Sequence, residues 1–101
     1  MKIDLKPVRL SDYIVKITPT ELLHENLYVK TVKVTVNKHY KGNLQLQSEI
    51  LALPGYIKLD EEYIVFLKKG DEMPSITARN GSVVKTNSPQ GKYVIEKYRG
   101  K

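Results

Sequence analysis

The chain of 101 residues contains no cysteine and no tryptophan, and only one phenylalanine. The absence of cysteine excludes a disulfide scaffold, a thiolate zinc site and a cysteine nucleophile. Apolar runs are short, as in residues 50–54 and 64–67, whereas a membrane-spanning helix needs about 20 apolar residues. We therefore expect no membrane-spanning segment. The length suits one domain, since domains usually have about 100–150 residues.

The first residues also lack the apolar stretch of a secretory signal. Residues 1–11 contain Pro7 and mixed charge, so we expect a flexible N-terminal segment there and a single domain over residues 12–101. The location is expected to be extracellular or at the cell surface if an upstream signal has been removed, and cytoplasmic otherwise.

Positive charge is in excess, with 17 Lys+Arg, 11 Asp+Glu and a net charge of +6. The excess is spread over residues 1–58 and 73–101, while residues 59–72 are acidic. No run of five like charges forms a basic arm. We interpret the basic charge mainly as solvated surface. The acidic residues are expected to keep a sheet edge soluble and not to bind calcium; they are Asp60, Glu61, Glu62, Asp71 and Glu72.

Alternation of apolar and polar residues is the main structural signal, and it is typical of half-buried strands. Residues 13–18 predict a strand, followed at residues 18–21 by either one capped helical turn or a plain loop. Residues 27–40 predict a long strand. Its apolar phase changes near Lys30 and Thr31, which indicates a bulge or bend.

Further strands are predicted at residues 44–53, at the very apolar and central residues 63–68, and at residues 92–98. Residues 75–79 and 82–86 flank Asn80-Gly81, a strong hairpin signal. We therefore predict an all-β fold, a five- to six-stranded OB-like barrel with at most one short helical turn. Its predicted core is Val15, Ile17, Val32, Val34, Val36, Ile50, Leu51, Ile64, Phe66, Val83 and Val84.

Four segments carry a family resemblance, at residues 12–17, 32–43, 59–68 and 80–85. Their order resembles a small domain of exported proteins from Gram-positive bacteria, which is itself similar to the OB-fold of the tissue inhibitors of metalloproteinases. The resemblance covers residues 12 to about 95 and implies an OB-like fold and an extracytoplasmic setting. It implies no activity or site residue. Those inhibitors use an amino-terminal cysteine, which this chain lacks, and Leu59-Asp60 departs from the glycine of the pattern.

Residues for catalysis or metal binding are sparse. His24 lies beside Glu25 and His39 lies before Tyr40, and neither has a partner four residues away as a helical metal site requires. Phosphate-binding glycine loops and nucleophile elbows are absent from the sequence. We therefore expect no enzyme, and we predict no catalytic residue, no metal ligand and no cofactor.

Seven tyrosines and many lysines remain as candidates for binding. We expect a non-catalytic, monomeric binding or interaction module whose partner is a protein or an anionic wall polymer. The alternative is an OB-type protein that binds single-stranded nucleic acid by stacking bases on aromatic rings along a basic groove. The candidate ligand-binding residues are Tyr28, Lys30, Lys33, Lys38 and Tyr40.

Overall fold

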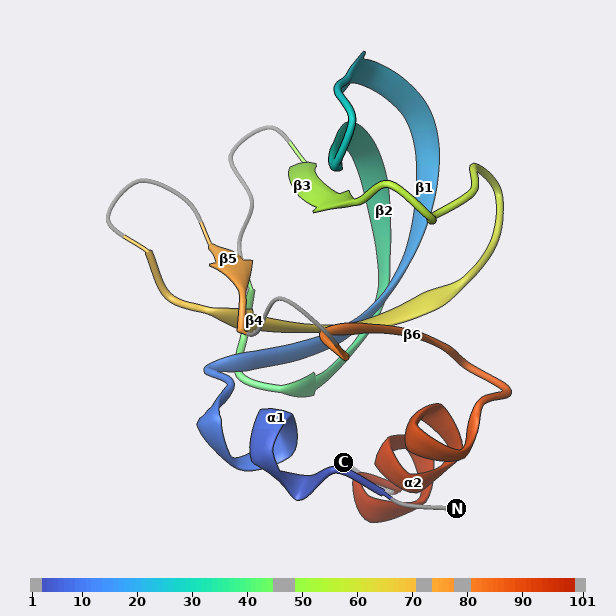
Figure 1. The fold of residues 1–101 in the computed structure, drawn as a ribbon. Helices are drawn as coiled ribbons and strands as arrows, with labels where there is room; N and C mark the ends of the chain where they lie inside the picture. The colour runs from blue at the N-terminus through green and yellow to red at the C-terminus, as the bar shows by residue number, and fades with distance from the viewer. Residues whose placement is uncertain (1–2, 45–48, 71–73, 78–80, 100–101) are drawn as a thin grey trace.

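The computed structural model describes residues 3–44, 49–70, 74–77 and 81–99. Within these ranges the chain forms six strands between two short helices (Figure 1). In chain order the elements are α1 (Leu5–Leu10), β1 (Tyr13–Glu25), β2 (Val29–Lys41), β3 (Ile50–Pro54), β4 (Tyr63–Lys68), β5 (Ser75–Ile76), β6 (Val83–Lys85) and α2 (Pro89–Lys97).

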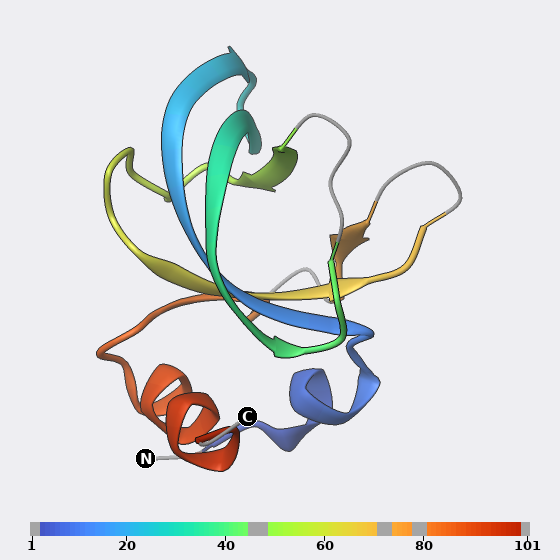
Figure 2. The same cartoon turned by 180° about the vertical axis from the view of Figure 1, so that it is seen from behind.

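All six strands belong to one antiparallel sheet with the order β3-β2-β1-β4-β5, and β6 also pairs with β4. Figure 2 shows that the sheet is strongly curved, with α1 and α2 together on its convex side. Among the described residues no ladder joins β3 to β5, so the sheet is not closed into a barrel. The protein is mostly β with short helices.

The long hairpin of β1 and β2 supplies most of the curvature. Its register slips four times, and one slip, between Leu22 and His24, lies opposite Val32 and Thr31. A slip of this kind inserts an extra residue into one strand, which bends the strand and increases its twist. The irregularity predicted near Thr31 is therefore present, but the extra residue lies in β1. The strand β1 continues to Glu25, so neither the helical turn nor the loop predicted at residues 18–21 forms.

The strand β4 is central, as its apolar sequence predicts. It pairs with β1 along one edge and with β5 and β6 along the other. Five of its six residues are buried. Burial on both faces explains the continuous apolar run, because a strand with one wet face would alternate.

The two faces of the sheet hold separate apolar clusters. The cluster on the concave face, here called the inner cluster, consists of Val15, Ile17, Val32, Val34, Leu44, Leu51, Leu53, Ile57, Tyr63, Val65, Leu67 and Val83. The cluster under the helices, called the outer cluster, consists of Val8, Ile14, Tyr40, Ile64, Phe66, Val94 and Tyr98. The predicted core residues divide between the two clusters, except that Val36, Ile50 and Val84 are only partly buried.

The closing strand predicted at residues 92–98 is wrong, because this segment lies mostly in α2. The Ser88 side chain accepts a hydrogen bond from the backbone N–H of Gly91 at 3.0 Å, and Pro89 follows at the first helical position. This combination of N-cap and proline starts a helix. Val94 and Tyr98 are four residues apart, so both face the outer cluster from one side of the helix.

The helix α1 occupies part of the N-terminal segment that the sequence predicts to be flexible. Asp4 caps it by accepting a hydrogen bond from the Lys6 N–H at 3.0 Å. Val8 is 3% exposed and packs into the outer cluster. Two helices exceed the single helical turn that was expected, so that part of the prediction is wrong. In the described ranges, neither helix has the length and apolar character needed to span a membrane.

The hairpin predicted around Asn80-Gly81 is also wrong. The strands β5 and β6 do not pair with each other but lie one after the other along the same edge of β4. Both run antiparallel to β4, so the chain keeps its direction between them. Residues 78–80 lie outside the described ranges. Gly81 has a φ of +79°, a conformation that glycine adopts easily.

Candidate binding groove

The two end strands of the curved sheet, β3 and β5, border a groove of about 370 Å³. This volume lies within the range of about 300–1,000 Å³ that is typical of ligand sites. No charged residue is among its described lining residues, which are Tyr28, Val29, Ala52, Leu53, Pro54, Pro74, Ser75 and Ile76. The groove is therefore apolar, in a protein with a net charge of +6.

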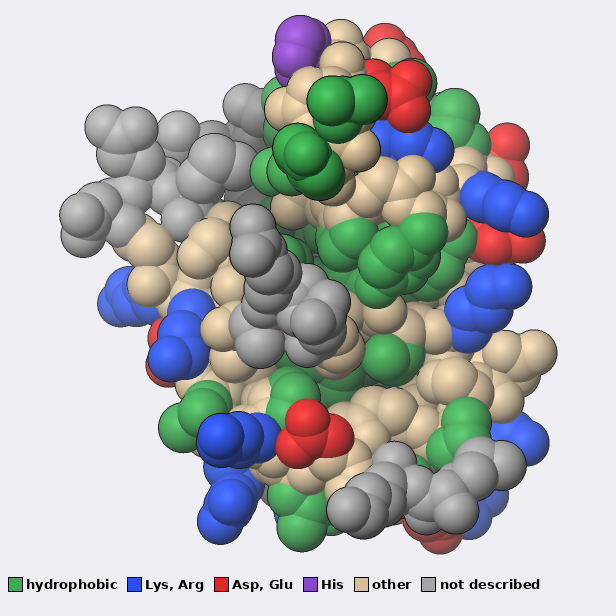
Figure 3. Space-filling model, viewed as in Figure 1, with side chains coloured by type: hydrophobic (Ala, Val, Ile, Leu, Met, Phe, Trp, Pro, Cys, Tyr) green, Lys and Arg blue, Asp and Glu red, His purple; other side chains and the backbone are tan. Residues whose placement is uncertain are grey.

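The groove connects the inner cluster to solvent. Leu53 is 1% exposed and belongs to the inner cluster, and Ile76 packs against that cluster while partly exposed. Tyr28, by contrast, is 80% exposed. In Figure 3 hydrophobic side chains gather over the hairpin and near the middle of this face, while most charged side chains lie nearer its margins.

The register of β3 determines which backbone groups face the groove. The Gly55 N–H donates to the Tyr28 carbonyl at 3.1 Å, and the Val34 N–H donates to the Glu49 carbonyl at 2.7 Å. In an antiparallel ladder the residues at alternate positions turn their backbone groups to the other side. Ala52, which lies opposite Thr31, therefore directs its N–H and C=O away from β2.

The strand β5 also has an outward-facing edge. The Thr77 N–H donates to the Phe66 carbonyl at 3.0 Å, so Thr77 faces β4. Ile76, its neighbour, lies opposite Leu67 and directs its N–H and C=O away from β4. Among the described residues neither β3 nor β5 has a further strand partner on this side. Two unpaired strand edges therefore border the apolar groove.

A tight turn holds Leu27 and Tyr28 at the end of the hairpin. The Asn26 side-chain oxygen accepts hydrogen bonds from the backbone N–H groups of Tyr28 at 2.8 Å and Val29 at 2.9 Å. The Asn26 N–H donates to the Val29 carbonyl at 3.0 Å. Leu27 is 89% exposed. Asparagine thus fixes the backbone and leaves two large side chains in solvent.

The predicted ligand-binding residues do not share one surface. Tyr28 lies at the rim of the groove. The Lys30 ammonium donates to the Ile57 carbonyl at 3.0 Å and lies 3.8 Å from the Glu25 carboxylate, so its charge is engaged within the protein. Lys33 is exposed on β2, outside the lining of the groove.

The other two predicted residues lie with the outer cluster. Tyr40 is 6% exposed, and its ring centroid is 6.4 Å from that of Tyr98. The Lys38 ammonium lies 5.5 Å from the Tyr40 ring centroid. Register slips near Val15 and Ile17 change which face of the sheet this end of β2 presents. Tyr40 is therefore a packing residue, and its ring has little surface for a base to stack on.

Ala52, Pro54 and Ile76 line the groove but were not among the predicted residues. No local motif marks them. They come together only because the sheet curves until its two ends approach each other. The change of apolar phase near Thr31 predicts a bend, but it does not say which residues the bend brings together.

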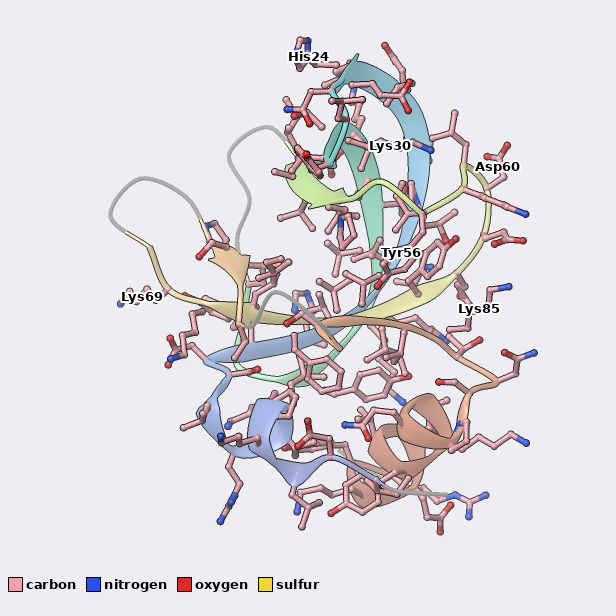
Figure 4. All side chains as sticks on the ribbon, viewed as in Figure 1. His24, Lys30, Tyr56, Asp60, Lys69 and Lys85 are labelled. Carbon is pink, nitrogen blue, oxygen red and sulfur yellow. The ribbon has the colours of Figure 1, made fainter. Side chains whose placement is uncertain are left out.

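The histidines and the described acidic residues lie apart from one another or in contacts within the protein. His24 is exposed near the end of the hairpin (Figure 4), and His39 is exposed on β2. Glu62 accepts a hydrogen bond from Asn37 at 3.1 Å and lies 3.7 Å from Lys16. No group of three metal-ligating side chains occurs within the described ranges. Asp71 and Glu72 lie outside those ranges.

Two tyrosine hydroxyls, one from the buried Tyr63 and one from the more exposed Tyr56, join the loop after β3 to the rest of the fold. The Tyr63 hydroxyl accepts from the Lys58 N–H at 2.8 Å and donates to the Glu61 carboxylate at 3.0 Å. The Tyr56 hydroxyl donates to the Val83 carbonyl at 2.7 Å. Burial of Tyr63 and partial burial of Tyr56 raise the pKa of each above its ordinary value of 10.0. Both remain protonated near neutral pH, and these contacts give them a structural role.

No family model, curated protein or solved structure matches this chain. Within the described part of the chain the groove combines an apolar surface, two unpaired strand edges and an exposed aromatic rim.

Proposed function

We propose that this chain is a non-catalytic binding module that takes an extended polypeptide segment of a partner protein into the groove between β3 and β5. The observation that carries the proposal is the combination of two unpaired strand edges with an apolar lining. Exposed sheet edges bind extended peptides by adding a strand, in which main-chain hydrogen bonds give affinity and side-chain pockets give specificity.

Ala52 is the central residue of this proposal. Its outward N–H and C=O pair with the backbone of the added strand, as the register of β3 supports. Every second side chain of the added strand then points into the groove toward Leu53. The Tyr28 ring, at the rim of the groove, packs over these side chains. An apolar residue at every second position is the partner sequence that such a groove selects.

The proposed fold is an OB-like barrel with an open seam between β3 and β5. The strand order β3-β2-β1-β4-β5 supports it, because pairing the two end strands would close a five-stranded barrel. The resemblance to domains of exported Gram-positive proteins agrees with this fold. It also supports the proposed location at the cell surface or outside the cell; without an upstream signal the location is the cytoplasm.

An anionic partner is less well supported at this groove. Neither a wall polymer nor a nucleic acid finds a cation among the described lining residues, and Lys30 is already engaged by Glu25. Single-stranded nucleic acid remains the alternative function because Tyr28 offers an exposed ring for stacking. It predicts that the logarithm of the affinity falls linearly with the logarithm of the salt concentration.

Selection of peptides from a random display library tests the proposal. Peptides that bind the unaltered protein are measured against Ala52→Pro, which removes the outward N–H, and against Ala52→Ser, which keeps the N–H and the small side chain. We expect apolar residues at alternate positions and a loss of binding of at least tenfold for Ala52→Pro alone, since one hydrogen bond and the fit of the strand are lost.

Two results would contradict the proposal. One is a set of peptides whose binding is unchanged by Ala52→Pro. The other is binding that disappears in moderate salt and depends on acidic peptides, because the groove offers such peptides no charge to recognise.

A further inference from the structure

Residues of α1 and α2 line a second hollow. Figures 1 and 2 show these two helices on the opposite side of the sheet from β3. Its volume is about 360 Å³. On α1 it is lined by Leu5, Val8 and Arg9, which share one helix face at spacings of three and four residues. The hollow is therefore built by the two helices that the sheet pattern did not predict.

The other wall of this hollow comes from α2 and from the end of β2. Tyr93 and Lys97 are four residues apart on α2, and Tyr98 follows at the helix end. Lys41 is the last residue of β2. Three cationic side chains and two tyrosines thus meet at one site, and no acidic residue is among the described residues that line it.

The three cations are not equivalent. The Lys41 ammonium is partly buried and donates to the carbonyls of Val8 at 3.0 Å and Arg9 at 3.2 Å. It therefore fixes the end of α1 beside the hollow. Arg9 and Lys97 are exposed and come from different helices. The Lys97 ammonium lies 5.8 Å from the Tyr98 ring centroid, so the charge stands over an aromatic surface.

The floor of the hollow is apolar. Val8 is 3% exposed and Tyr98 is 8% exposed, and both belong to the outer cluster. Leu5 remains 45% exposed at the edge. A ligand that enters would thus meet carbon surface below and positive charge at the rim. Charge complementarity then requires an anionic group, and the floor favours an apolar body attached to it.

We propose that the hollow between α1 and α2 binds a small aromatic anion, with its phosphate or carboxylate group between Arg9 and Lys97 and its ring against Val8 and Tyr93. Arginine suits this task because its planar guanidinium donates two parallel hydrogen bonds to such a group. Cations in the last turn of a helix also complement the helix dipole. The dipole alone does not explain why cations from two helices and a strand line the same hollow.

Titration with phenyl phosphate, followed by the amide NMR spectrum of the full chain, tests this site. Phenol and inorganic phosphate serve as controls that carry only the ring or only the charge. We expect saturable shifts at amides of α1 and α2, an affinity at least several-fold higher than for either control, and no shift at Ala52 or Ile76. Shifts at those two residues would instead report the groove of the proposed function.

Charge-reversal variants sharpen the test. Arg9→Glu and Lys97→Glu are each expected to weaken phenyl phosphate binding about tenfold or more, because each removes a charge-assisted contact and adds repulsion. Lys92→Glu is the matched control: it lies on α2, is exposed, does not line the hollow and changes the net charge equally. It should leave affinity nearly unchanged in moderate salt.

Thermal unfolding of each variant shows whether the fold is kept. Lys97→Gln provides a neutral replacement if a reversed charge disturbs α2. Equal weakening by Lys92→Glu and Lys97→Glu would overturn the proposal, since it would reduce the effect to overall charge. Binding of phenol as tight as that of phenyl phosphate, or the absence of saturable shifts at α1 and α2, would also overturn it.

Discussion

The groove and the hollow between the helices lie on opposite sides of one sheet and differ in charge. The groove is lined by the two sheet ends and has no charged residue among its described lining residues. The hollow is lined by helix side chains and carries three cations. The net charge of +6 is therefore a poor guide to the partner, because one surface avoids charge and the other concentrates it.

The difference extends to how each side is built. The inner cluster is formed by strands and the loops between them, and strand alternation predicts much of it. The outer cluster needs Val8, Val94 and Tyr98 from helices near the two ends of the chain. Substitutions in the outer cluster and a change of pH that acts on the inner cluster test whether the two sides contribute separately to stability.

The largest effect is expected in the outer cluster. Phe66 is fully buried there. We expect Phe66→Ala to lower the free energy of unfolding by about 3–5 kcal/mol, because it removes a large ring and leaves a cavity. Urea unfolding measures the change. A loss below about 1 kcal/mol would mean that the helices do not seal this face.

Gly91 provides a more selective test of the same side. A Cβ atom at Gly91 would collide with the carbonyl oxygen of Lys85 and lie 2.9 Å from that of Thr86. In a free helix alanine is favoured over glycine by about 1 kcal/mol. We nevertheless expect Gly91→Ala to destabilise the protein by about 1–3 kcal/mol, since close packing must open.

Gly55→Ala is the control for Gly91→Ala, because its nearest contact would be an ordinary 3.6 Å from the Tyr28 carbonyl. Thermal unfolding compares the two variants. A more stable Gly91→Ala protein would show that α2 does not rest closely against the backbone after β6.

The inner side is expected to respond to alkaline pH. Burial, together with hydrogen bonding to Glu61, raises the pKa of Tyr63 above its ordinary value of 10.0. The folded state then holds its proton more tightly than the unfolded state. The stabilisation is complete below pH 10 and is lost as the pH rises through the raised pKa.

Urea unfolding at a series of pH values measures this loss. Tyr63→Phe should be less stable near neutral pH, because the Lys58 N–H loses its acceptor. Its stability should fall less steeply above pH 10. An equal slope in both proteins would assign the alkaline loss to the other buried tyrosines, such as Tyr40 and Tyr98, whose pKa values burial also raises.

The sequence predicts the central strand well because β4 is buried on both faces and has no competing pattern. The strand prediction fails over α2 because Tyr93, Ile95 and Lys97 occupy every second position, a spacing that would place them on one face of a strand. The cap at Ser88 is the local signal for the helix, and packing of Val94 beneath the sheet decides the outcome.

The candidate site is harder to predict than the strands. Tyr28 was identified from its type and position, and it lies at the rim of the groove. Tyr40 was expected on the same surface, but slips of register in the hairpin place it in the outer cluster. Ala52 and Ile76 are distant in sequence and meet only through curvature, which residue types do not encode directly.

Amide hydrogen exchange of the free protein tests the two open edges most directly. The N–H groups of Ala52 and Ile76 point away from their ladders, whereas that of Leu53 faces β2 and that of Thr77 donates to Phe66. We predict much faster exchange at Ala52 than at Leu53 and at Ile76 than at Thr77, and slowing at Ala52 when a selected peptide binds. Equal protection within each pair in the free protein would show that these edges are already paired, and it would contradict the proposed groove.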